Sequence, residues 1–265
     1  MRKSILSYLP IFVLFSLFLS ACVQEKEEDT PPAPELPTAE MFVMKFDDFE
    51  DADTTKSFNN WFHAATNVVV WNTVIALNTA IPVAAFYESF NHDAAFQGNN
   101  TWQWSYSYPL GNDTYNARLV GRLNGANVEW EMFIAKQNGF SEVLWYEGTT
   151  KVDRSAANWT LNHNPNAPES LIAIEYERIN IDGNEQITYT NVIPNSADNG
   201  DFITYYLNTD ATFDANYDIF RTQQNNMTAI KWNRMTKDGR VKDPVKFGND
   251  DWHCWDVELQ DVDCL

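Results

Sequence analysis

The sequence is poor in basic residues, with 18 lysines and arginines against 37 aspartates and glutamates and a formal net charge of −19. Such a surface repels phosphate backbones, so we exclude nucleic acid as a partner. Cysteine is also scarce, at three residues, and no two cysteines have the CxxC spacing of metal and redox sites. We therefore expect no metal centre and no cofactor.

Motifs of the common enzyme classes are missing. The chain has no GxSxG elbow, no HExxH, no P-loop and no GxGxxG. Residues 214–218 begin like a calcium loop, but Ile219 and Asn225 stand where an EF-hand has glycine and glutamate. An EF-hand is excluded, and a looser calcium site there or at residues 47–53 is an alternative. The four histidines are spread over separate segments: His63, His92, His163 and His253.

Paired carboxylates are the one catalytic pattern present. Glu129 and Glu131 share one face of an expected strand, as do Glu175 and Glu177, with about 7 Å between neighbours. That separation suits an inverting glycosidase. Carboxylates on one strand face more commonly point together into water. We therefore expect a protein that is not an enzyme and keep a glycan hydrolase as an alternative.

The amino terminus has the pattern of a secretory signal peptide. Arg2 and Lys3 precede an uncharged, mostly apolar run that ends in the small residues Ser20 and Ala21. The rival interpretation is a membrane-spanning helix, which Pro10 and the small-residue end disfavour. We expect residues 1–21 to be removed.

Leu19-Ser20-Ala21-Cys22 matches the lipobox of bacterial lipoproteins. Together with the aromatic, β-rich remainder, this motif makes the chain resemble the envelope lipoproteins of Bacteroidota. The resemblance implies that Cys22 becomes the first mature residue and carries diacylglycerol and an amide-linked chain such as palmitate. Two or more acyl chains anchor a protein to a membrane without a spanning helix. The alternative role of Cys22 is half of a disulfide.

Residues 22–39 are predicted to form a tether between the anchor and the folded domain. The acidic run at residues 24–29 resembles the export signal of Bacteroidota surface lipoproteins, which implies an outer-membrane location and display on the cell surface. The alternative is that these charges only keep the tether solvated. The prolines that follow predict a stiff, extended spacer without a core: Pro31, Pro32, Pro34 and Pro37.

Residues 40–265 are expected to form a single, mainly β domain of α+β type. Residues 40–49 alternate in polarity and predict a first strand. Residues 55–90 lack glycine and are apolar nearly all round at helical spacing, which predicts a buried helical hairpin or one helix kinked at Pro82.

A membrane span over residues 68–86 is the alternative for this helical segment. Its polar residues would then lie in hydrocarbon without evident partners, which is unfavourable. These residues are Asn72, Thr73, Asn78 and Thr79. A helix packed on a sheet is therefore preferred.

From residue 101 the hydrophobic period drops to two, and strands follow at short spacing. Gly and Asn in the connections favour hairpins, so we predict an antiparallel meander of about ten strands. A sheet of that length curls, so a barrel or half-barrel with the helices on one face or in one mouth is expected, and a sandwich is the alternative. The predicted strands are 101–110, 115–123, 128–136, 141–148, 159–163, 171–181, 186–193, 202–207, 217–221 and 228–235.

Cys254 and Cys264 are the remaining cysteines, ten residues apart. Outside the reducing cytosol they are expected to form a disulfide, and closing this loop stabilises the fold by about 3 kcal/mol. Free thiols, or a metal site that includes His253, are the alternatives.

Aromatic and basic residues of the strands supply the candidate ligand contacts. Tryptophans at the mouth of a barrel can stack on a sugar or enclose an apolar ligand, although strand aromatics are more commonly core. Arg118 and Arg122 share a strand face and join the candidates if that face is concave. The candidate tryptophans are Trp102, Trp104, Trp130 and Trp145.

The sequence thus predicts a lipid-anchored outer-membrane protein that serves as a binding or scaffold module for a glycan or a small apolar ligand. An accessory subunit that contacts another envelope protein is the second hypothesis, and the hydrolase is the third.

Overall fold

A computed structural model describes residues 31–46, 49, 59–179 and 184–264 of the chain. Residues 32–265 form one compact unit. The predicted signal peptide, Cys22 and the acidic run all lie outside the described residues, and so do most of residues 47–53.

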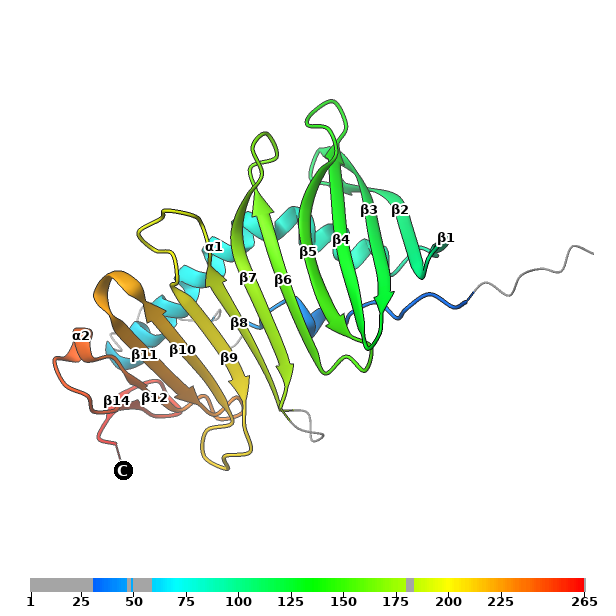
Figure 1. The fold of residues 1–265 in the computed structure, drawn as a ribbon. Helices are drawn as coiled ribbons and strands as arrows, with labels where there is room; N and C mark the ends of the chain where they lie inside the picture. Colours follow the sequence, from blue (N-terminus) through cyan, green and yellow to red (C-terminus); the bar gives the residue numbers. More distant parts are fainter. Residues whose placement is uncertain (1–30, 47–48, 50–58, 180–183, 265) are drawn as a thin grey trace, which may run out of the picture. The chain divides into compact units, whose positions relative to one another are not determined.

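The domain is built on one antiparallel sheet in which each strand pairs with the next along the chain (Figure 1). This confirms the mainly β prediction and the long meander. The strands are β1 (Ala95–Gly98), β2 (Thr101–Leu110), β3 (Asp113–Asn124), β4 (Asn127–Lys136), β5 (Val143–Lys151), β6 (Ala156–His163), β7 (Glu169–Arg178), β8 (Glu185–Asn191), β9 (Phe202–Leu207), β10 (Ala215–Arg221), β11 (Asn226–Trp232), β12 (Gly239–Lys242), β13 (His253–Trp255) and β14 (Asp261–Val262).

The sheet has 14 strands, four more than the ten predicted segments. The additional strands β1, β12, β13 and β14 have two to four residues each, too few to show a period. Among the described residues β1 and β14 are the two edges and do not pair, so the sheet is open. A half-barrel fits this arrangement, whereas a closed barrel does not.

Tryptophan and glycine alternate across neighbouring strands on the buried face. Trp102, Gly121, Trp130, Gly148 and Trp159 lie opposite one another in register from β2 to β6. A side chain on Gly148 would place its Cβ 2.2 Å from the carbonyl oxygen of Asn158 and 2.4 Å from the Trp159 ring. The indoles therefore occupy the space that the glycines leave free, and this row fixes the register of the strands.

One long helix, α1 (Asn59–Ser89), crosses the strands on this face, which we call the inner face (Figure 1). It is a single helix with Pro82 inside it, so the hairpin alternative is wrong. Its buried side is anchored near the carboxyl-terminal end, because Tyr106 and Tyr108 donate to the carbonyls of Ala85 and Ile81. By length and composition α1 could also cross a membrane, a property that core helices share.

Within the segment 40–49, the described residues 40–46 are not a strand, which corrects the sequence prediction. Residues 39–41 form the short helix η1 (Ala39–Met41), and residues 42–46 are irregular. Side chains of the sheet take the place of a partner strand: Trp159 Nε1 donates to the Met41 carbonyl at 2.9 Å, and Tyr189 donates to that of Phe42 at 2.8 Å. Burial raises the pKa of the Tyr189 hydroxyl, which keeps its proton available for this bond.

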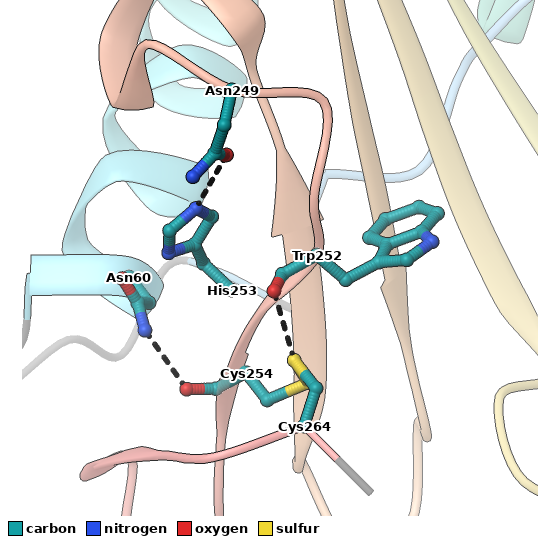
Figure 2. Close-up of a disulfide and its surroundings, with 6 residues drawn as sticks. All are labelled: Asn60, Asn249, Trp252, His253, Cys254 and Cys264. Carbon is teal, nitrogen blue, oxygen red and sulfur yellow. Dashed lines mark hydrogen bonds between the residues drawn. A yellow bond between two sulfur atoms is a disulfide. The ribbon is translucent and has the colours of Figure 1, made fainter.

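Cys254 and Cys264 form the predicted disulfide, with their Cα atoms 5.3 Å apart (Figure 2). The bridge joins β13 to the chain after β14 and so positions the first turn of α1. Asn60 Nδ2 donates to the Cys254 carbonyl at 2.9 Å, and the Asn60 amide donates to Asp261 Oδ1 at 3.0 Å. A carboxylate at this end of a helix satisfies free N–H groups and complements the helix dipole.

Candidate functional site

The tryptophans expected to contact a ligand lie in the core. Trp102, Trp104, Trp130 and Trp145 have exposures of only 1–6%. Trp130 Nε1 donates to Thr150 Oγ1 at 2.9 Å, so its polar edge is already used. The structure places these residues in the hydrophobic core and not at an open mouth.

Arg118 and Arg122 lie on the opposite, outer face of the sheet. Arg118 pairs with Glu142 at 2.6 Å and stacks on Phe133 at 4.0 Å, and Arg122 lies 3.6 Å from Glu129. The structure therefore separates the two arginines from the tryptophans by the thickness of the sheet. No single ligand touches both groups.

The glutamate pairs also face outward. Glu131 lies opposite Glu147 in the β4–β5 register, beside a cavity of about 320 Å³ that Arg122 and Glu129 also line. Glu129 has a half-exposed side chain, and Glu175 and Glu177 are exposed. A general acid needs a desolvated carboxyl group, which these surface positions do not supply.

A large cavity lies where α1 passes the ends of β7, β8 and β10. We call it the α1 cleft, and its volume is about 810 Å³. Its floor is apolar, with Val70, Trp71 and Val74 from α1 and Leu171 and Ile172 from β7. Ligand pockets commonly combine such a floor with a few polar groups at the rim.

The rim comes from the β8–β9 connection and from η3 (Thr222–Gln224), which follows β10. Asp201 holds the two together, because its Oδ1 accepts from the amide and the hydroxyl of Thr222 at 2.7 and 2.6 Å. Asp198 Oδ1 accepts a hydrogen bond from Gln223 Nε2, which also joins the β8–β9 connection to η3. The rim carboxylates are thus fixed in place.

Two basic side chains complete the rim. Arg221 lines the cleft, and its Nη2 donates to Asn67 Oδ1 of α1 at 2.7 Å. His163 Nε2 is shielded from solvent without a hydrogen-bond partner among the described residues, and Glu169 Oε2 lies 3.7 Å away, too far for such a bond.

A buried carboxylate anchors α1 next to this cleft. Asp243 is 5% exposed and accepts from His63 of α1 at 2.8 Å, from Asn226 at 2.8 Å and from Thr228 at 2.9 Å. Its burial opposes the charged form, but these bonds and that of the Lys246 amide outweigh burial and hold the pKa of Asp243 below its usual range. Asp243 therefore stays ionised and fixes the helix.

A second, smaller cavity of about 320 Å³ lies on the other side of α1. It is lined by Phe42, Val43 and Met44 and by Ile75 and Val83 of the helix. The Tyr189 hydroxyl in its wall already bonds Phe42 and Met44. This cavity offers apolar contact but few polar groups.

The structure provides no set of ligands for the alternative calcium site at the described residues 214–218. Asp214 is engaged by Arg234, whose Nε lies 2.9 Å from Asp214 Oδ2, and burial raises the pKa of Asp218. Within the residues that the structure describes, no three His, Cys, Asp or Glu side chains converge as metal ligands.

Sequence reasoning did not find the α1 cleft. Trp71 lies within the apolar helical segment at residues 55–90, and Arg221, Asp198 and Asp201 have no recognisable spacing in the sequence. The polar connection at residues 194–201, which follows a strand and precedes another, was the one available signal.

No protein-family model, curated protein or solved structure matches this chain.

Proposed function

We propose that the chain is an outer-membrane lipoprotein, anchored through Cys22, whose domain binds an amphipathic small molecule in the α1 cleft. The lipobox residues Leu19-Ser20-Ala21-Cys22 support the anchor and its location. One observation carries the binding role: a cleft of about 810 Å³ joins an apolar floor to a polar, fixed rim. Its volume lies within the range of about 300–1,000 Å³ that is typical of ligand pockets.

The chemistry of the cleft narrows the ligand class. The floor of Val70, Trp71 and Val74 suits an alkyl chain or the apolar face of a ring. Asp198 and Asp201 line the same rim as Arg221 and offset its charge. A head group rich in hydroxyl or amide groups therefore fits better than an isolated phosphate.

Native mass spectrometry of protein purified from bacterial envelopes tests this role. The unmodified protein is expected to retain a ligand noncovalently, and Val74→Asp is expected to lower the retained fraction at least about tenfold, because the new carboxylate would have to be desolvated against the ligand.

Val69→Asp is the matched control. Val69 is 43% exposed and Val74 is 45% exposed on the same helix, but only Val74 lines the cleft. The control should retain ligand as the unmodified protein does. Equal loss in both variants, or no ligand in any sample, would argue for the accessory-subunit hypothesis instead.

A further inference from the structure

The side of α1 that faces away from the sheet carries no charge. Between Asn59 and Tyr87 the helix has no Asp, Glu, Lys or Arg, although the chain as a whole carries −19. Large apolar side chains are exposed along this side. They are Phe62 at 52%, Val69 at 43%, Leu77 at 79% and Tyr87 at 47%, whereas the exposed Val70 and Val74 line the α1 cleft.

The polar residues on this side are satisfied within the helix itself. After the first turn the exposed ones are Thr66, Thr73 and Asn78, and each donates to the carbonyl four residues earlier, at 2.7, 2.8 and 2.7 Å. Such back-bonding gains little in water, where solvent would serve as well. In apolar surroundings it removes the cost of an unpaired donor.

The chain segment before α1 packs between the helix and the inner face of the sheet, because Phe42 contacts both Phe86 and Trp159. Phe42 stacks on Phe86 of α1 with ring centroids 5.2 Å apart. Further upstream, Pro32 and Pro34 line a cavity together with the inner-face residues Trp102 and Val128. Residues 32–42 of the domain therefore lie on the α1 side of the sheet. Ten residues separate Cys22 from Pro32 and span at most about 36 Å when fully extended.

We propose that this uncharged side of α1 lies on the lipid bilayer that holds the anchor, with the helix axis along the membrane plane. This inference rests on the proposed acylation of Cys22, which holds the protein at the membrane. A helix of 31 residues is about 46 Å long and presents its apolar row along its length. Such side chains enter the boundary between head groups and acyl chains.

The composition of the face sets the lipid preference. Interfacial helices that bind anionic membranes carry lysine or arginine, and this side of α1 has none. The net negative charge of the chain also opposes anionic lipids. Neutral phosphatidylcholine is thus the expected surface, with weaker contact on vesicles that contain phosphatidylglycerol.

Site-specific fluorescence on the envelope-purified protein in phosphatidylcholine vesicles tests the proposal. A thiol-reactive fluorophore is attached at Leu77→Cys, and Asn158→Cys is the control, because Asn158 is exposed on the outer face of the sheet. The Leu77 label should be quenched by nitroxide lipids, and its quenching by aqueous iodide should fall at least about threefold on reconstitution. The Asn158 label should show neither change.

Every other result of this labelling experiment supports one specific alternative. A Leu77 label that iodide reaches as easily as the control, in protein whose intact mass shows acylated Cys22, overturns the bilayer contact and leaves the anchor standing. Protection from iodide without quenching by nitroxide lipids, with crosslinks between copies, overturns it in favour of self-association. Intact mass without acyl chains contradicts the anchor, and the same labels then report whether α1 binds lipid by itself.

Discussion

Replacing Gly148 by alanine is expected to lower the free energy of unfolding by about 3 kcal/mol. The new Cβ would lie 2.2 Å from the Asn158 carbonyl oxygen and 2.4 Å from the Trp159 ring. Neither a backbone carbonyl nor a buried indole can move away without disturbing the β5–β6 pairing. Urea denaturation followed by far-UV circular dichroism measures the change.

Gly139→Ala is the matched control for this substitution. A Cβ at Gly139 would meet only the flexible side chain of Lys136, at 3.0 Å. We expect a change within about 0.5 kcal/mol, as for most surface substitutions. If the two substitutions changed the free energy of unfolding equally, this would contradict the claim that the tryptophan–glycine row determines the strand register.

Asp243→Ala is expected to destabilise the protein by about 3–5 kcal/mol, because it leaves several buried donors without their acceptor. The carboxylate joins His63 of α1 to Asn226 and Thr228 of β11. Asp250→Ala is the control, since Asp250 is an exposed aspartate that pairs with Lys242 at 3.2 Å. Surface pairs of that kind contribute about 1 kcal/mol or less.

The same carboxylate gives the stability a defined pH dependence. The pKa of Asp243 is lowered in the folded state, so its contribution is complete above the unfolded value of about 3.9 and is lost as the pH falls through the lowered pKa. The difference in stability between the unmodified protein and Asp243→Ala should therefore be constant near neutral pH and shrink below about pH 4. A difference that grew toward low pH would contradict this linkage.

Most of the sheet could be predicted from the sequence, because a period of two is visible within each strand. Trp102, Trp104 and Tyr106 alternate with polar residues, and they all face inward in β2. The same argument failed for residues 40–49. Their buried residues alternate as in a strand, but tyrosine and tryptophan side chains of the sheet bind their backbone. The alternation of apolar residues shows which side chains are buried, but it does not show whether the backbone pairs with a strand or with side chains.

The site was beyond the reach of sequence reasoning for a different reason. Alternation shows which residues share a face, but it does not show which face a helix covers. Trp130 and Arg118 were therefore grouped as ligand contacts although the sheet separates them. The α1 cleft draws on α1, η3, four strands and the β8–β9 connection. Their meeting depends on long-range anchors such as the bond from Arg221 to Asn67.

Photocrosslinking in the absence of vesicles tests the binding role of the α1 cleft most directly. The probe is a diazirine-bearing monoacylglycerol, used below its micelle concentration, which pairs an alkyl chain with a hydroxyl head group. The account predicts crosslinks to residues 70–78 of α1 together with residues 191–201 of the rim, which face each other across the cleft. Crosslinks confined to residues 42–46 beside the smaller cavity, or to the outer face around Glu147, would contradict it.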